Sequence, residues 1–115
     1  PYSPYEQVWH IHEAQKDLFE YSRDSYYSSP EWPSGYWPPE KGPNDEEEWK
    51  SLVDAVFRDR DAFVEWIKDP ANDLFQPFEN GSGHNLFRQA LLVIEHNAYH
   101  NGQLVVLLRE LGVWE

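Results

Sequence analysis

Apolar residues recur every three or four positions in three long segments of the chain, with polar residues between them. The first segment runs from about Ser3 or Pro4 to Ser22. This spacing is typical of an amphipathic helix that buries one face. We expect Ser3 to cap the helix, since Pro4 then occupies the first helical position and Glu6 has the capping-box spacing. The predicted apolar face comprises Val8, Ile11, Ala14, Leu18 and Tyr21.

Two further helices are predicted, and no segment has a convincing strand pattern. The second helix begins at Asn44, its expected N-cap, and continues to Asp69, where a proline follows. The third runs from about Asn85 to Leu111, with Gly112 in the C-cap position. The predicted fold is therefore all-α.

Residues 23 to 43 break the helical periodicity and join the first two predicted helices. Aromatic residues rarely remain idle in water, so we expect an ordered connection packed across the domain. Two interpretations remain open: a crossover that covers exposed core, or a lid that shapes a ligand pocket. The segment interleaves five prolines with five aromatics: Pro30, Pro33, Pro38, Pro39 and Pro43 with Tyr26, Tyr27, Trp32, Tyr36 and Trp37.

Composition limits the partners of the chain. At 115 residues it is expected to form one domain, residues 1–115, with a formal net charge of −12 and no basic cluster. Binding to nucleic acid or to an anionic membrane depends on such clusters, so we exclude both as partners. Cysteine is absent, so a metal ion would have to bind histidine, carboxylate or water. The longest apolar run, Leu104 to Leu108, is far too short to span a bilayer.

His96 and His100 are four residues apart in the third predicted helix. Side chains at this spacing lie on one face of a helix, so both rings can reach one ion. The pair is half of a typical transition-metal site, although two unrelated histidines are also consistent with a chain that has five. Gly102 lies nearby and costs about 1 kcal/mol relative to alanine, so we expect another backbone or a ligand to approach it closely.

A third histidine ligand has two candidates on the first predicted helix. His10 and His12 flank Ile11, each about 100° from it and in opposite directions. Helix geometry alone leaves them equivalent.

Three stretches of the sequence resemble the DinB-like superfamily, also called YfiT-like. The resemblance covers nearly the whole chain, and its most specific part is the C-terminal H-N-A-Y-H-x-G-Q motif. It is similar to the branch of the superfamily that has an aromatic and proline-rich crossover. The stretches are "SPYEQVWHIHEAQKDLFEYSRD", "SPEWPSGYWP" and "EHNAYHNGQLVVLLRELGVW".

The resemblance implies a four-helix bundle in which three histidines hold one divalent metal, commonly nickel or zinc. The pair on the last helix matches His96 and His100. In similar sequences the remaining ligand precedes an Ala-Gln pair by four residues, which corresponds to His10 ahead of Ala14 and Gln15. Tyr99 and Gln103 are then candidate pocket residues, with core packing equally consistent for Tyr99, while Glu95 is expected at the surface. Glu13 lies near a ligand in sequence, and the catalytic residues stay unassigned.

One departure from the family pattern affects the expected assembly. The segment with His10 corresponds to the second helix of the family, so the first helix is missing and we expect an N-terminally incomplete bundle. Three helices leave an open apolar trough. A lost N-terminal stretch, a partner chain or a swapped dimer would close it, and we expect a homodimer.

We expect a cytoplasmic protein and consider two functional hypotheses. The first is a metalloenzyme, because related proteins include transferases and isomerases that use low-molecular-weight thiols such as bacillithiol or mycothiol. Thiol-dependent transfer of a small-molecule substrate is expected first, and metal-dependent hydrolysis second. The second hypothesis is a non-catalytic bundle that pairs with itself or binds a partner through the crossover and the trough.

Overall fold

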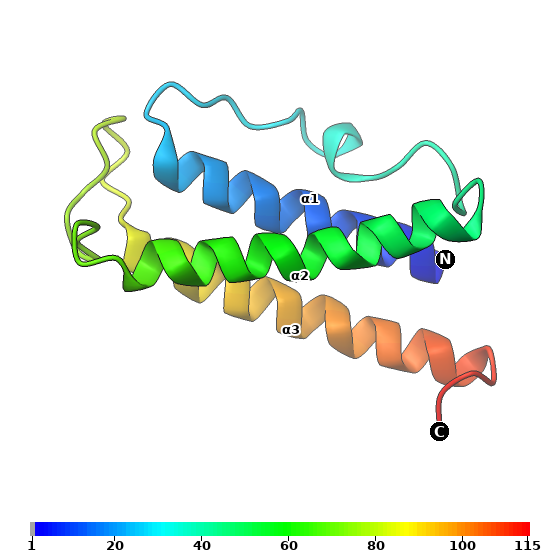
Figure 1. The fold of residues 1–115 in the computed structure, drawn as a ribbon. Coiled ribbons are helices and arrows are strands. Elements are labelled where there is room, and N and C mark those ends of the chain that lie inside the picture. Colours follow the sequence, from blue (N-terminus) through cyan, green and yellow to red (C-terminus); the bar gives the residue numbers. More distant parts are fainter. Residues whose placement is uncertain (1) are drawn as a thin grey trace.

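Three α-helices and one short 3-10 turn make up the regular structure of residues 2–115, which the computed structural model describes (Figure 1). No strand occurs within these residues, so the all-α prediction is confirmed. Helix α1 packs against both α2 and α3. None of the helices in this range is both long and apolar enough to cross a membrane. The elements are α1 (Pro4–Arg23), the turn η1 (Ser34–Tyr36), α2 (Glu46–Lys68) and α3 (Leu86–Glu110).

The first turn of α1 has the predicted capping box. The Ser3 hydroxyl accepts from the Glu6 main-chain nitrogen at 3.1 Å, and the Glu6 carboxylate accepts from the Ser3 nitrogen at 2.9 Å. Pro4 occupies the first helical position, where its missing N–H costs nothing. The two hydrogen bonds satisfy donors that a helix start otherwise leaves free, and they fix where α1 begins.

The start of α2 lies one residue later than predicted. Asp45, not Asn44, is the N-cap, and its carboxylate accepts from the Glu48 main-chain nitrogen at 2.8 Å. Asn44 instead donates to the Glu48 carboxylate from its main chain and its side chain. The prediction was wrong because Asn and Asp are equally good caps and a glutamate follows three residues after each of them.

The ends of α3 agree with the sequence pattern. The Asn85 side chain caps the helix by accepting from the Arg88 main-chain nitrogen at 2.9 Å. At the other end Gly112 follows the C-cap residue Leu111 and has a φ of +74°, a conformation that glycine adopts without steric cost. The interior of α3 differs from expectation at Gly102. A Cβ added there would meet no atom of another described segment within 4 Å, so the predicted approach of another backbone was wrong, and the alternative of a nearby ligand stays a prediction.

One cluster of buried apolar residues joins the three helices. Phe19 of α1, Phe63 of α2 and Leu86 of α3 form this cluster, and the rings of the two phenylalanines lie 4.9 Å apart. Their burial supplies hydrophobic stabilisation where all three helices meet. Surrounding side chains that are partly buried against the cluster are Leu18, Trp66, Ile67, Leu74, Phe78 and Val93.

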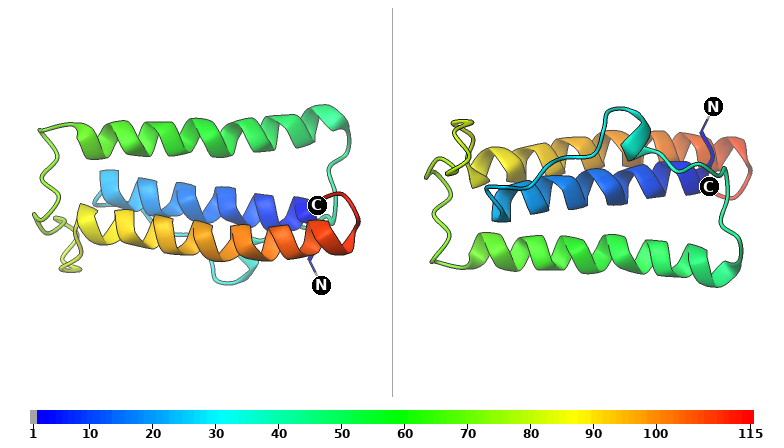
Figure 2. Two further views of the ribbon diagram at one scale, coloured as in Figure 1. Left: turned by 90° about the horizontal axis from the view of Figure 1, so that it is seen from below. Right: turned by 90° about the horizontal axis from the view of Figure 1, so that it is seen from above.

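The crossover between α1 and α2 runs back along α1 as an ordered segment (Figure 1). Its η1 turn bulges on the side of α1 and α3 that faces away from α2 (Figure 2). The Tyr36 hydroxyl donates to the Asp17 carboxylate at 2.8 Å, which ties the turn to α1. Burial and this hydrogen bond raise the pKa of Tyr36 to about 12, so the phenol keeps its hydrogen. The crossover thus packs against α1 through Tyr36, whereas Tyr26 and Trp32 are 93% and 70% exposed, so the expectation that its aromatic residues are packed holds only in part.

An apolar groove runs between α2 and α3 on the opposite side of the molecule. It consists of two adjoining hollows of about 380 and 320 Å³, and Gln15, Arg60 and Asn97 border both. Phe57 and Ile94 on its two walls are 51% and 67% exposed. No acidic residue lines either hollow. The other apolar side chains of this α2–α3 groove include Val53, Val56, Val64, Ile67, Ala90, Leu104 and Leu108.

Candidate metal centre

Three histidines from two helices meet beneath the crossover. His10 comes from α1, and His96 and His100 come from consecutive turns of α3. Each ring offers one nitrogen, and the three nitrogens lie within 4.8 Å of one another. The Nε2 atoms of His10 and His96 are 3.1 Å apart. His10 is 2% exposed and His100 is also buried, so water has little access to these two rings.

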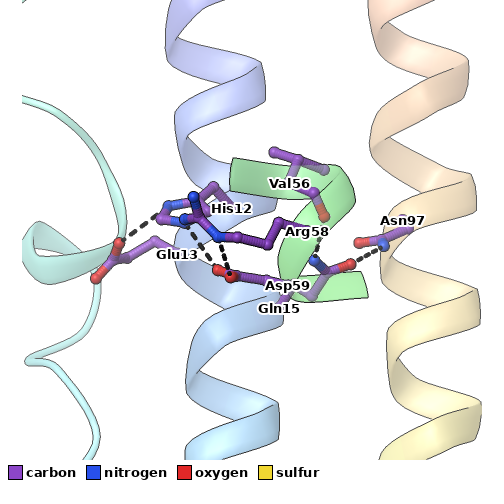
Figure 3. Close-up of polar contacts among 7 residues, drawn as sticks. All are labelled: His12, Glu13, Gln15, Val56, Arg58, Asp59 and Asn97. Carbon is purple, nitrogen blue, oxygen red and sulfur yellow. Dashed lines mark hydrogen bonds and ion pairs between the residues drawn. The ribbon is translucent and has the colours of Figure 1, made fainter. Parts of the chain in front are cut away.

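His12 lies outside this cluster, between α1 and α2 (Figure 3). Its Nε2 is 3.1 Å from the Asp59 carboxylate, and its Nδ1 is 3.7 Å from the Glu13 carboxylate. Sequence geometry left His10 and His12 equivalent, whereas packing distinguishes them. The reason is that α3 and the crossover lie on one side of α1 and α2 lies on the other.

Hydrogen bonds to Nδ1 set the tautomer of two of the histidines. Nδ1 of His10 lies 2.9 Å from the main-chain oxygen of Tyr36, and Nδ1 of His100 lies 3.0 Å from Oε1 of Gln7. Both oxygens only accept hydrogen bonds, so each Nδ1 carries the hydrogen. The lone pair of each ring is therefore on Nε2, which faces the centre of the cluster.

The environment keeps the three imidazoles neutral. Burial, followed by the neighbouring His100 and His10, lowers the pKa of His96 to about 4, while the side chain of Asn97 opposes the change. Burial also lowers the pKa of His10, against the opposing effect of the Tyr36 carbonyl. The pKa of His100 is lowered by burial and by His10. Neutral imidazole is the form that binds metals, so the cluster needs no deprotonation at neutral pH.

Aromatic side chains of the crossover and the N-terminal segment cover the cluster. The Trp37 ring stacks on His10 with centroids 4.0 Å apart, and Tyr2 stacks on the far face of Trp37 at 3.8 Å. The stack restricts the approach of water to His10 from this side. Sequence reasoning missed Gln7, Tyr36 and Trp37 as neighbours of the histidines. Only Gln7 had a local signal, because it lies one helical turn before His10.

A small cavity opens beside His96. Its volume is about 270 Å³, and the crossover contributes part of its wall. The cavity supports the interpretation of the crossover as a segment that shapes a pocket. Its lining residues are Ala14, Asp17, Leu18, Trp32, Tyr36, Leu92 and His96.

The remaining candidates lie around the cluster. Tyr99 is 62% exposed, with its ring edge-on to His100 at 5.0 Å and its hydroxyl accepting from Gln103 Nε2 at 2.9 Å. Gln103 lines a separate shallow hollow, not the cavity beside His96. Glu95 is exposed, as expected. Glu13 faces His12, not the three-histidine cluster.

The donor set fits a divalent transition metal. Two imidazole nitrogens on one tetrahedral zinc ion lie about 3.3 Å apart, because each zinc–nitrogen bond is about 2.0–2.1 Å. The 3.1 Å between His10 and His96 is close to this value, and His100 lies within reach of both. Converging lone pairs repel one another unless a hydrogen or a cation lies between them. Three such nitrogens are therefore better matched by a metal ion than by hydrogen bonds among themselves.

Comparison with known proteins gives one family and no individual relative. The model of the DinB family matches residues 4–115, which is nearly the whole chain. Neither the curated proteins nor the solved structures yield a match.

Proposed function

Because the chain belongs to the DinB family, we propose that His10, His96 and His100 bind one divalent transition metal, nickel or zinc, in a metalloenzyme active site. The observation that carries the proposal is the convergence of three neutral imidazoles whose ring nitrogens lie within 4.8 Å. Two of these rings are already held in the ligating tautomer by Tyr36 and Gln7. A hydrogen bond from the ring nitrogen that does not bind the metal is a regular feature of metal-binding histidines.

The proposed chemistry is Lewis-acid catalysis on a small molecule. Three protein ligands leave a position free, where a bound metal polarises a substrate group or lowers the pKa of a water or thiol. The stack of Tyr2 and Trp37 excludes water from one side of the cluster. The cavity beside His96 is open to a substrate of modest size. We place thiol-dependent transfer with a low-molecular-weight thiol first and hydrolysis second.

Metal content is the first test of this proposal. Protein purified without a metal-affinity tag should contain about one metal ion per chain by elemental analysis. Alanine at His10, His96 or His100 should remove it, because two imidazoles rarely hold such an ion alone. His12→Ala is the matched control and should keep the metal, since His12 contacts Asp59. Equal metal content in the wild type and in His96→Ala would contradict the assignment.

A thiol titration tests the reaction class. Cobalt-substituted protein should show a changed ligand-field spectrum when a low-molecular-weight thiol is added at sub-millimolar concentration. The change should be absent in His100→Ala. No response to any thiol, together with no hydrolysis of activated esters or amides, would favour a non-catalytic role.

The α2–α3 groove supports this second proposal, in which the chain is a non-catalytic module that associates with a second copy of itself. Its walls expose Phe57 and Ile94, and its lining is almost entirely apolar. Exposed apolar surfaces of this kind usually mark a contact with another protein. A helix of the second copy in the groove would complete a four-helix bundle around α1. Residues 1–115 would then act as one domain of a homodimer.

A further inference from the structure

Two side-chain amides link α2 to the residue that follows His96. Gln15 is 1% exposed and donates from Nε2 to the main-chain oxygen of Val56 at 2.9 Å. Asn97 donates from Nδ2 to Oε1 of Gln15 at 3.0 Å (Figure 3). A main-chain oxygen only accepts, so the orientation of the Gln15 amide is fixed. Asn97 must therefore turn its NH2 group toward Gln15, which leaves its Oδ1 as a free acceptor.

Two buried atoms beside this link complement each other. Asn97 Oδ1 and His96 Nδ1 are both buried, and neither makes a regular hydrogen bond with the rest of residues 2–115. A buried polar atom without a partner is costly. The amide oxygen of Asn97 can only accept a hydrogen bond. Nδ1 of His96 donates one when the ring is in the tautomer that leaves the lone pair on Nε2.

We propose that Oδ1 of Asn97 accepts the Nδ1 hydrogen of His96 and thereby positions Nε2 of this ring toward the metal. The inference rests on the proposed metal site. It gives His96 the same kind of contact that Tyr36 gives His10 and Gln7 gives His100. Asn97 is thus a positioning residue, and Gln15 holds its amide in the required orientation. Such contacts fix the ring orientation and the tautomer of a ligating histidine.

The affinity test compares Asn97→Ala with Asn101→Ala. Asn101 is one turn further along α3 and also borders the α2–α3 groove, but it is exposed, so its substitution removes the same side chain without removing a buried contact. Zinc affinity is measured by competition with a chromogenic chelator. Asn97→Ala should bind zinc about 10–100-fold more weakly than the wild type, and Asn101→Ala should bind like the wild type. Equal zinc affinities in the two folded variants would overturn the inference but leave the proposed function intact. Failure of the wild type to bind zinc would contradict both.

The first part of a spectroscopic test needs only the wild type, and the second part uses the two variants. Long-range ¹⁵N–¹H spectra of the zinc-loaded wild type, labelled at its histidines, show which nitrogen of His96 carries hydrogen. We expect hydrogen on Nδ1 and the metal on Nε2, with slow exchange of the Nδ1 hydrogen. That exchange should become fast in Asn97→Ala and stay slow in Asn101→Ala. Coordination of zinc through Nδ1 of His96 would overturn the inference.

Discussion

The side of the molecule under the crossover and the side with the α2–α3 groove differ from an ordinary protein interior and surface in opposite ways. Under the crossover the molecule gathers three imidazoles, two of them buried, and the ring of Trp37, itself stacked on Tyr2, stacks on His10. In the α2–α3 groove it exposes apolar side chains, including Phe57 and Ile94. Burying polar groups and exposing apolar ones both cost free energy of folding. The comparison indicates that stability alone does not explain either side, which is why we propose a metal for one and a second copy of the chain for the other.

The groove and the histidine cluster lie next to each other. Gln15 and Asn97 line both hollows of the groove, and Asn97 directly follows His96. The apolar cluster of Phe19, Phe63 and Leu86 adjoins the groove, because Phe63 also lines one of its hollows. The groove therefore continues from the apolar core onto the surface.

The largest expected effect concerns the groove. Ile94→Glu places a charge on an apolar wall, so it should weaken self-association at least about 100-fold, equivalent to about 2.7 kcal/mol. Sedimentation equilibrium measures this as a change from dimer to monomer at micromolar concentration. Tyr26→Glu is the control, because Tyr26 is exposed outside the groove. A wild type that stays monomeric would contradict the role of the groove as an interface between copies.

The second largest effect is expected at Trp37, whose ring stacks on His10. Trp37→Ala removes the ring stacked on His10, so it should lower the free energy of unfolding by about 2 kcal/mol. Metal affinity should also fall about tenfold as water gains access to the site. Trp37→Phe keeps an aromatic ring, so it should retain most of the free energy of unfolding and most of the metal affinity. Urea titration and chelator competition provide the measurements, and unchanged values in Trp37→Ala would show that the stack is incidental.

A smaller effect is expected from acid on the metal-free protein. The pKa of His96 is about 4 in the folded chain and near 6.5 when unfolded, so the unfolded state binds more protons between these values. The contribution of this group to stability is complete above pH 6.5 and is lost as the pH falls toward 4. Acidification from pH 7 to 5 should therefore lower the free energy of unfolding by about 1 kcal/mol through this residue. Urea titrations at both pH values should show a smaller loss of unfolding free energy in His96→Ala than in the wild type. The same difference in both proteins would show that protonation of His96 is not the cause.

The smallest effect is expected at Gly102, whose substitution should change stability but not metal binding. Alanine at this position meets open space and improves helix propensity, so Gly102→Ala should raise the free energy of unfolding by roughly 0.5–1 kcal/mol. Metal content should not change. Thermal unfolding and elemental analysis test both points, and a loss of metal would support the expectation that a ligand lies close to this glycine.

Local sequence signals predicted the helices well but not the contacts between them. The capping box of Ser3 and the cap at Asn85 depend on neighbouring residues only, so the pattern identified them. The cap of α2 was misplaced by one residue because Asn44 and Asp45 carry the same local signal. The predicted approach of another backbone to Gly102 was wrong because helix propensity does not tell which part of the chain faces a residue.

The candidate site was predictable only as far as spacing and family resemblance allow. Four-residue spacing brought His96 and His100 together, but the choice between His10 and His12 required the resemblance. In the structure His10 joins the cluster because α3 packs on that side of α1. The stacking of Trp37 depends on the path of an irregular segment, which composition does not determine.

Anomalous diffraction from crystals of the protein with its metal as purified tests the central claim most directly. Data collected on both sides of the absorption edge locate the ion and identify the element. We predict one peak per chain among the Nε2 atoms of His10, His96 and His100, with each nitrogen about 2.0–2.2 Å from a zinc or nickel ion. A fully occupied peak at His12 and Asp59, or no peak at the three histidines in metal-replete crystals, would contradict the account.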